Sequence, residues 1–333
     1  MAGRDTVTIG ASSGGVEALA RLVGGLPADL PAAVLVVQHF PEDVPSSLPS
    51  ILDRAGPLPA AHAEDGDGIE NGRIYVAPPG RHMLVEDGRV RLTRGPKENY
   101  HRPAADALFR SAAVARGPRV VGVVLTGARD DGTAGLVAVK RRGGVAVVQD
   151  PDDALFRQMP ESALRYADVD HRVPLGEMPA LLTRLSRGPS GERGADPVPE
   201  DMEFEAKIAG LDPSAIDGGE HPGEVSGFTC PECTGPLFEI REGRLVRYRC
   251  RVGHAYTADG VLEGKAEALE EALYAALNTL EEGAEMADKL ASRARRNGQS
   301  QASERFGARA RRSREQATTI RSVLTQGAAR DAG

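Results

Sequence analysis

Residues 1–186 alternate short apolar runs with helical segments, and this alternation restricts the fold more than any other feature of the chain. Five runs rich in Val, Ile or Ala predict strands, at Thr6–Gly10, Ala33–Gln38, Arg73–Ala77, Val120–Leu125 and Val145–Val148. Helices are expected between them, at Gly15–Val23, Ala104–Ala115 and Thr133–Arg142. Short runs that are apolar along their whole length are typical of strands covered on both faces. The pattern therefore predicts a doubly wound α/β fold with a mainly parallel sheet.

One antiparallel hairpin is expected within this region. Met83–Glu86 and Arg89–Leu92 are separated by Asp87-Gly88, a strong turn signal.

Composition narrows the function classes. The chain carries 41 Lys+Arg against 48 Asp+Glu, so its net charge of −7 argues against whole-chain binding to nucleic acid or anionic membranes. Its apolar runs are too short to span a membrane, and its first residues lack the apolar core of a signal peptide. The three cysteines lie between residues 230 and 250, which fits a reducing environment. We therefore expect a cytoplasmic protein.

The rest of the chain divides into three further segments. Residues 187–226 hold 12 Gly+Pro in 40 positions and 10 acids against 3 bases, so an acidic, flexible linker is expected there. Residues 227–256 contain every cysteine, and residues 257–326 show apolar positions at helical spacing, interrupted at Asn297-Gly298. The expected organisation is thus an α/β domain at 1–186, the linker, a small cysteine module and a C-terminal α-helical hairpin.

A glycine-rich turn after the first predicted strand contains a candidate nucleophile. The hexapeptide Gly10-Ala-Ser-Ser-Gly-Gly15 includes G-x-S-x-G, which can present a serine beside free backbone N–H groups at a helix start. Phosphate binding is poorly supported, because the Gly-Lys-Ser/Thr and G-x-G-x-x-G patterns are missing. A serine-rich helix cap is the structural alternative.

Two other residues favour the nucleophile. His39 follows the second predicted strand, and Asp131 follows a later one within Leu125-Thr-Gly-Ala-Arg-Asp-Asp-Gly132. Catalytic groups of parallel sheets gather at the carboxyl ends of strands, so Ser12, His39 and Asp131 are expected to meet in one cleft. Their order along the chain, Ser–His–Asp, differs from the Ser–Asp–His order of α/β-hydrolases.

The strings IGASSGG, VVQHFP, IYVAPPGRHM, HRPAADALF and LTGARDDGTAG resemble the catalytic domain of the chemotaxis protein-glutamate methylesterases (CheB), over residues 6–185. The resemblance implies Ser12 rather than its neighbour Ser13 as nucleophile, His39 as base and Asp131 as the residue that orients it. It also implies an oxyanion site made by the amide of Ser13 and one from the Gly127–Ala128 loop, Ala128 being our choice. The implied reaction is cofactor-free hydrolysis of γ-methyl glutamate esters on chemoreceptor-like proteins, with glutamine deamidation as a second activity.

Two features depart from the family pattern. Ala128 and Arg129 stand where a Met and a Gly are common, so Arg129 is expected to narrow the cleft, alter substrate choice or pair with Asp130. The family's usual N-terminal receiver domain has no counterpart here, which predicts constitutive activity or control in trans through the C-terminal hairpin. A non-catalytic scaffold is the alternative that the altered loop favours. For His82 and His101 we expect packing or surface roles.

The cysteines form a metal-ligand pattern. Cys230, Cys233, Cys250 and His254 give C-x2-C-x16-C-x3-H, and a hairpin signal at Glu242-Gly243 lies between the two pairs. This spacing predicts a zinc-ribbon-like module with one structural zinc, a redox C-x-x-C or a free thiol pair being the alternatives. We expect zinc removal to leave the Ser12 chemistry intact, since the linker should separate the two parts.

The C-terminal hairpin has two oppositely charged helices. Residues 263–288 contain eight acids and one Lys, whereas residues 293–321 contain nine Arg and two Glu. Pairing of these charges across an antiparallel seam is expected, with a protein partner or dimer as the use of the surface. The alternative is a nucleic-acid-binding regulator that uses the zinc ribbon and the Arg-rich face, which is disfavoured by the few aromatic residues.

Overall fold

The computed structural model describes residues 3–190, 197–217 and 223–330. It divides into two compact units, Met1–Val261 and Leu262–Gly333.

A seven-stranded parallel sheet forms the centre of the first unit, with strand order β3-β4-β2-β1-β7-β8-β9. Its strands are β1 (Thr6–Ala11), β2 (Ala33–Gln38), β3 (Ala60–His62), β4 (Ile74–Val76), β7 (Val120–Val124), β8 (Val145–Gln149) and β9 (His171–Val173). The five predicted strands are confirmed. The two edge strands, β3 and β9, were not predicted.

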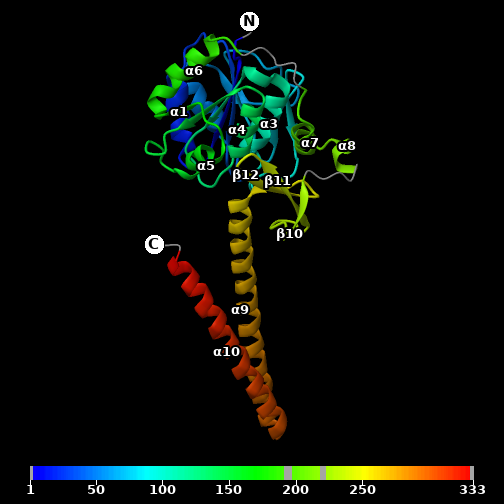
Figure 1. Cartoon of the computed structure of the whole chain (residues 1–333). Coiled ribbons are helices and arrows are strands. Elements are labelled where there is room, and N and C mark those ends of the chain that lie inside the picture. Colours follow the sequence, from blue (N-terminus) through cyan, green and yellow to red (C-terminus); the bar gives the residue numbers. More distant parts are fainter. Residues whose placement is uncertain (1–2, 191–196, 218–222, 331–333) are drawn as a thin grey trace. The chain divides into compact units, whose positions relative to one another are not determined.

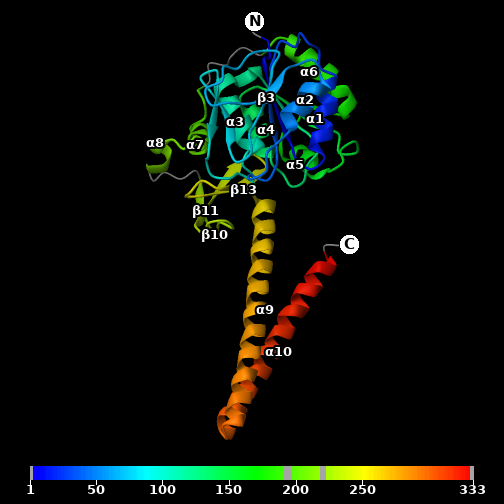
Figure 2. The same cartoon turned by 180° about the vertical axis from the view of Figure 1, so that it is seen from behind.

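Helices cover both faces of this sheet (Figures 1 and 2), as the doubly wound prediction requires. One face packs against α1 (Gly15–Gly24), α2 (Leu48–Ala55) and α6 (Met178–Arg187). The other packs against α3 (Ala105–Arg116), α4 (Thr133–Arg141), α5 (Gln158–Tyr166) and the hairpin of β5 (His82–Glu86) and β6 (Arg89–Thr93). Two short 3₁₀ turns, η1 (Gly117–Arg119) and η2 (Leu175–Glu177), complete the layers.

The chain changes direction of winding between β1 and β7, which are neighbours in the sheet. In open α/β sheets, ligands bind outside the carboxyl ends of the strands at this switch point. Ser12 follows β1 and residues 125–132 follow β7, so the fold places both at the expected binding edge.

The segment expected to be a flexible linker contains two helices, α7 (Glu200–Ala209) and α8 (Pro213–Asp217), which corrects that expectation. Helix α7 packs against α3 and buries Met202, Glu205 and Ile208 on one face. The apolar residues of α7 have helical spacing, but one position of its buried face is occupied by the acidic Glu205. The acidic composition of the segment therefore conceals the amphipathic pattern of the helix. Residues 191–196 and 218–222 of the expected linker lie outside the described residues.

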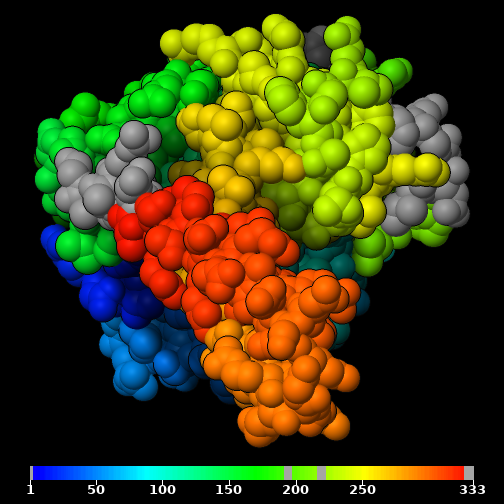
Figure 3. All heavy atoms as spheres, turned by 90° about the horizontal axis from the view of Figure 1, so that it is seen from below, coloured from blue at the N-terminus to red at the C-terminus, as the bar shows by residue number. Residues whose placement is uncertain are grey.

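The cysteine module is a four-stranded antiparallel sheet of β10 (Glu224–Thr229), β11 (Pro236–Glu242), β12 (Leu245–Cys250) and β13 (Ala255–Thr257). The predicted hairpin at Glu242-Gly243 is confirmed as the β11–β12 connection. Leu237, Tyr248 and Tyr256 pack with Cys230 and Cys250 in a small core. Seen as spheres, its yellow to yellow-green residues form a contiguous mass with an outer face open to solvent (Figure 3).

This module is joined to the α/β domain by a buried ion-pair network. Glu205 of α7 contacts Arg110 of α3 and Arg247 and Arg249 of β12, at 2.8 to 3.2 Å. Glu98 contacts Arg110 and Arg249 at 2.7 and 3.1 Å. The expectation that the cysteine module is separate from the catalytic domain is therefore wrong, and the module lies within the first compact unit.

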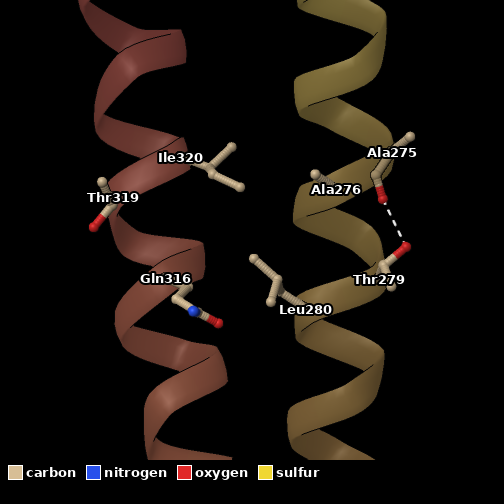
Figure 4. Close-up of a pocket in the computed structure, with 7 residues that line it drawn as sticks. All are labelled: Ala275, Ala276, Thr279, Leu280, Gln316, Thr319 and Ile320. Atoms are coloured by element: carbon tan, nitrogen blue, oxygen red, sulfur yellow. Dashed lines mark hydrogen bonds between the residues drawn. The ribbon is translucent and has the colours of Figure 1, made fainter.

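Two long helices, α9 (Ala258–Arg296) and α10 (Ser300–Arg330), confirm the predicted helical hairpin and its break at Asn297-Gly298. Within the second unit, Arg314 pairs with Asp288 and Arg321 with Glu281, so opposite charges meet across the helices as expected. Figure 4 shows Leu280 and Ile320 pointing toward one another across a groove of about 720 Å³ between the helices. Among the described helices, none combines the length and apolar character needed to cross a bilayer.

Candidate active site

Ser12 lies at the junction between β1 and α1. Its amide donates to Thr126 O at 3.0 Å, and its carbonyl accepts from Gly15 N–H at 2.8 Å, which closes a tight turn. Gly14 has φ of +74°, a conformation in which a residue with a side chain is strained. Ser12 is therefore held where the strand stops and the helix begins, next to the loop that follows β7.

His39 occupies the equivalent place on the neighbouring strand. Ala11 of β1 is paired with Gln38 of β2, so Ser12 and His39 each come one residue after a paired position. The buried Gln38 side chain donates to Ser12 O at 2.8 Å and to His39 O at 3.1 Å. Because adjacent strands are about 4.8 Å apart, this pairing brings the two residues to one edge of the sheet.

Asp131 meets His39 from the loop after β7. His39 Nε2 lies 2.8 Å from Asp131 Oδ2, and the two side chains are 5% and 1% exposed. The other ring nitrogen of His39, Nδ1, is buried and has no hydrogen-bond partner within residues 3–190, 197–217 and 223–330. A neutral His39 that donates from Nε2 thus keeps a lone pair on Nδ1 with which to accept a proton.

Asp131 is held as a carboxylate by His39 and by neutral donors. It accepts from the backbone N–H groups of Ala105 and Asp106 at the start of α3, at 2.6 and 3.1 Å, and from Asn99 Nδ2 at 3.0 Å. Burial would raise the pKa of Asp131, but the hydrogen bond and charge of His39 and these donors outweigh it and hold the pKa well below its usual range.

Three neighbours of this pair were missed or undervalued in the sequence. His101, expected to be a packing or surface residue, stacks on His39 with ring centroids 3.6 Å apart. Burial and then the charge of His39 lower the pKa of His101 to about 3, so His101 stays neutral. Asn99 bridges Asp131 and Asp106, with its Nδ2 2.8 Å from Asp106 Oδ2. Burial and then Asp131 raise the pKa of Asp106 to about 8.

His82 has the structural role expected for it. It is fully buried, its Nε2 donates to Pro96 O at 2.9 Å and its Nδ1 accepts from Ala104 N–H at 3.2 Å.

The backbone amides around Ser12 differ in what they already bind. Gly127 N–H donates to Phe156 O at 3.0 Å, and Arg129 N–H donates to Gln158 Oε1 at 3.3 Å. Within the described residues, the amides of Ser13 and Ala128 have no such acceptor. A Cβ at Gly127 would lie 2.1 Å from Met159 Sδ and 2.8 Å from Ser12 Cβ, so only glycine fits beside the serine.

Arg129, which departs from the family pattern, lies over an aromatic ring. Its guanidinium carbon is 4.7 Å from the centroid of Tyr100, and its φ is +64°. Asp130 accepts a hydrogen bond from Thr257 Oγ1 of the cysteine module. Both residues before Asp131 are thereby tied to groups outside the loop.

The cysteine module brings its four predicted ligands together. Cys230, Cys233, Cys250 and His254 offer ligand atoms that all lie within 4.8 Å of one another. His254 Nδ1 is 3.7 Å from Cys230 Sγ and 3.6 Å from Cys250 Sγ, and the sulfurs of Cys233 and Cys250 are 3.6 Å apart. Edges of roughly 3.3–3.8 Å are those of a tetrahedron with metal bonds of about 2.0–2.3 Å, so the group fits one tetrahedral ion.

Comparison with known proteins agrees with this geometry. The family model of the CheB methylesterases matches residues 7–182. A "protein-glutamate methylesterase/protein-glutamine glutaminase 2" of Methanosarcina mazei is 38% identical over 192 residues, which are 55% of this chain and 52% of the relative. Enzyme 5 of the same name from Anaeromyxobacter dehalogenans is 40% identical over 185 residues, 54% of this chain and 51% of the relative.

A solved structure covers the same part of the chain. The crystal structure of the Thermotoga maritima CheB methylesterase catalytic domain aligns with a TM-score of 0.53 and 33% identity, over 56% of this chain and 100% of that one. This chain spans about half the length of the curated relatives it matches. The family model covers more than half of the present chain, and its match includes Ser12, His39 and Asp131. The chain therefore belongs to the CheB methylesterase family.

Proposed function

We propose that residues 1–186 form a serine esterase with Ser12 as nucleophile, His39 as general base and Asp131 as the group that orients His39. The observation that carries this proposal is the buried His39–Asp131 pair, which leaves His39 Nδ1 without a partner in the described structure, at the edge of the sheet where Ser12 follows β1. The pair fixes which ring nitrogen holds the proton, and this is the requirement of a general base.

In the proposed mechanism, His39 Nδ1 takes the Ser12 hydroxyl proton while Oγ attacks the ester carbonyl. The carbonyl oxygen becomes an oxyanion, and the amides of Ser13 and Ala128 are the free donors to stabilise it. Asp131 stabilises the charged imidazole. The protonated His39 then gives this proton to the departing methoxide oxygen, which leaves as methanol, and a water activated by His39 hydrolyses the acyl-enzyme.

We propose γ-methyl glutamate esters on chemoreceptor-like proteins as the substrate, in the cytoplasm. The names of the relatives from M. mazei and A. dehalogenans support this class. The same names support glutamine deamidation as a second activity, since an amide and an ester form the same acyl-enzyme and differ only in whether ammonia or methanol leaves.

Methanol release from methylated receptor membranes tests this proposal. Wild-type protein should release methanol and react with a serine-directed fluorophosphonate, whereas Ser12→Ala should lose both. Ser13→Ala is the matched control, because it changes the adjacent hydroxyl and keeps the amide. Release that survives Ser12→Ala would defeat the assignment. Folded wild-type protein that neither releases methanol nor reacts would favour the non-catalytic scaffold.

We propose zinc as the ion of the Cys3His group, in a structural role. Three thiolates and one imidazole are typical ligands of closed, tetrahedral zinc sites. Metal analysis of the purified chain should give about one zinc per chain, and Cys233→Ser should lower this value. Another metal in that place, or none after anaerobic purification, would contradict the proposal.

For the helical pair we propose a protein partner rather than nucleic acid. The α10 arginines Arg314 and Arg321 are engaged by acids of α9, and the groove of Figure 4 has Leu280 and Ile320 at its centre. Salt-sensitive retention of the chain on DNA or RNA would contradict this.

A further inference from the structure

The cysteine module forms backbone hydrogen bonds with the segment 97–101 of the α/β domain. Asn99 N–H donates to Ala255 O at 2.8 Å, and Ala255 N–H donates to Lys97 O at 3.3 Å. Ala255 is the first residue of β13 and directly follows the metal-ligand candidate His254. The position of segment 97–101 therefore depends on the strand that leaves the Cys3His group.

Segment 97–101 carries residues that contact the proposed base. Asn99 donates to Asp131, and His101 stacks on His39. Asn99 and Tyr100 have φ values of +49° and +69°. Asparagine adopts this region readily, but a bulky residue such as Tyr100 occupies it only when the surroundings impose it. Without its hydrogen bonds to β13, this segment would relax toward ordinary backbone conformations, and Asn99 and His101 would move with it.

Tyr100 links the module to the loop that follows β7. Its hydroxyl donates to Gly260 O at 2.7 Å, in the first turn of α9, and its ring centroid is 4.8 Å from that of Tyr256. The guanidinium carbon of Arg129 lies 4.7 Å from the Tyr100 ring centroid. Tyr256 in turn places its hydroxyl 3.2 Å from Cys230 Sγ. A continuous set of contacts thus runs from the cysteines to the residue beside Ala128.

We propose that Tyr100 is a positioning residue through which metal binding at the Cys3His group controls turnover at Ser12. This inference rests on the proposed esterase function. With the ion bound, β12, β13 and the first turn of α9 are held together and fix Tyr100, Asn99 and Arg129. Without it, no bond joins the four ligand side chains, the connection between Cys250 and His254 opens, and the support beneath Tyr100 is lost.

The effect should fall on kcat more than on KM. The contacts at stake position the base and the loop that carries the Ala128 amide, which matter most in the transition state. A displacement near 1 Å at such groups lowers rate by about 100-fold. The present chain has no Trp and six Tyr, so tyrosine near-ultraviolet circular dichroism reports Tyr100 and Tyr256 without interference from tryptophan.

The first experiment compares the full chain with one zinc bound, after removal of zinc by a chelator, and after zinc is returned. Stripping should lower kcat for methanol release by about 100-fold, change KM by less than about threefold, and be reversed by zinc. The tyrosine dichroism should change in parallel. A stripped protein that keeps its kcat overturns the inference.

The second experiment asks whether Tyr100 transmits the effect. Tyr100→Phe keeps the ring under Arg129 and removes only the bond to Gly260. Its zinc-loaded kcat should fall, and the ratio of loaded to stripped kcat should shrink to under about tenfold. Tyr166→Phe, which alters a tyrosine in α5, should keep the full wild-type ratio. Equal ratios in wild type and Tyr100→Phe overturn the inference.

Unfolding on zinc removal and absence of esterase activity have different meanings for this inference. If stripping unfolds the chain, the loaded proteins decide: a lower kcat for Tyr100→Phe with unchanged zinc content and melting supports the inference, and an unchanged kcat overturns it. If loaded wild type neither releases methanol nor reacts with the fluorophosphonate, the proposed esterase function fails. The coupling is then judged by whether zinc changes the tyrosine dichroism of wild type more than that of Tyr100→Phe.

Discussion

Two regions of the first unit keep buried carboxylates ionised in different ways. Asp131 is surrounded by an imidazole, an amide side chain and two backbone N–H groups. Glu205 is surrounded by the guanidinium groups of Arg110, Arg247 and Arg249. Neutral donors stabilise a charge without cancelling its field, so Asp131 would still attract the positive charge that the proposed mechanism places on His39. The guanidinium groups neutralise Glu205, which suits a junction between parts and not a catalytic site.

The largest effect should come from removing the charge at the catalytic edge. Asp131→Asn is expected to lower kcat by about 10⁴, because an amide cannot hold the required tautomer of His39 or stabilise its charged form. One N–H at the start of α3 would also lose its acceptor, at about 1–3 kcal/mol of stability. Steady-state methanol release and urea unfolding measure the two effects.

Asp152→Asn is the control for Asp131→Asn, since that carboxylate is 72% exposed and pairs with Arg157 and Arg172. It should change neither kcat nor stability by a measurable amount. An Asp131→Asn enzyme that keeps a tenth of wild-type kcat would show that the carboxylate does not orient the base.

The second largest effect should come from breaking the buried Arg–Glu network, which should lower the free energy of unfolding. Glu205→Gln leaves three buried guanidinium groups without their shared counter-charge and is expected to cost about 3–5 kcal/mol of unfolding free energy. Glu203→Gln, on the same helix in an exposed pair with Lys207, should cost less than about 1 kcal/mol. Urea unfolding compares the two. Equal losses would mean that the network does not join the module to α3.

A smaller difference between the two regions is expected in how the stability of the protein depends on pH. Burial would raise the pKa of Glu98, but Arg110 and Arg249 hold it at about 2. Glu98 therefore adds stability that is present above its unfolded pKa of about 4.3 and is lost as pH falls toward 2. Asp106 has the opposite effect on the pH dependence of stability. Because its pKa is raised to about 8, the folded state binds a proton that the unfolded state lacks. Stability therefore falls as pH rises from about 4 to 8.

Asp106→Asn should remove the decrease in stability between about pH 4 and 8 and leave the loss at low pH that comes from Glu98. The unfolding free energy of wild type should decrease between pH 5 and pH 8.5 by more than that of the variant, whatever constant offset the substitution adds. Denaturant melts at the two pH values give this difference. Parallel decreases in both proteins would contradict a protonated Asp106.

The smallest effect should come from the exposed charges of the helical pair. Arg314 and Asp288 are 55% and 45% exposed, so Arg314→Ala should cost no more than about 1 kcal/mol. The loss should shrink further in 1 M salt, where exposed charges are screened. Thermal melts followed by helical dichroism measure it. A loss of several kcal/mol that does not depend on salt would mean that this exposed pair contributes as much to stability as the buried Arg–Glu network.

The sequence predicted the parts of the molecule that follow from local pattern. The Val-rich strands, the turn at Ser12, the places of His39 and Asp131, and the Cys3His spacing all came from neighbouring residues. The three-residue edge strands β3 and β9 have too few positions for a period, and they are only partly buried. Asn99 and His101 reach the catalytic edge through a loop with left-handed residues, which neither periodicity nor spacing reveals.

The burial of α7 and the attachment of the cysteine module were also beyond prediction, for another reason. Glu205, Arg247 and Arg249 each look like surface residues, because a charged side chain is buried only when partners from other segments surround it. Those partners come from α3, α7 and β12, so no local window contains them.

The pairing of Glu98 with Arg249 joins residues 151 positions apart in the chain. On a ribosome that adds roughly 5–20 residues per second, Glu98 waits on the order of 10 to 30 s before its partner is made. Once Arg187 has been added, the nascent α/β domain has its strands and helices but still lacks β13, which forms backbone hydrogen bonds with segment 97–101. The order of synthesis therefore makes the catalytic edge the last part of the domain to be completed. A chain stalled on the ribosome before residue 255 has the parallel sheet but lacks the strand that supports segment 97–101.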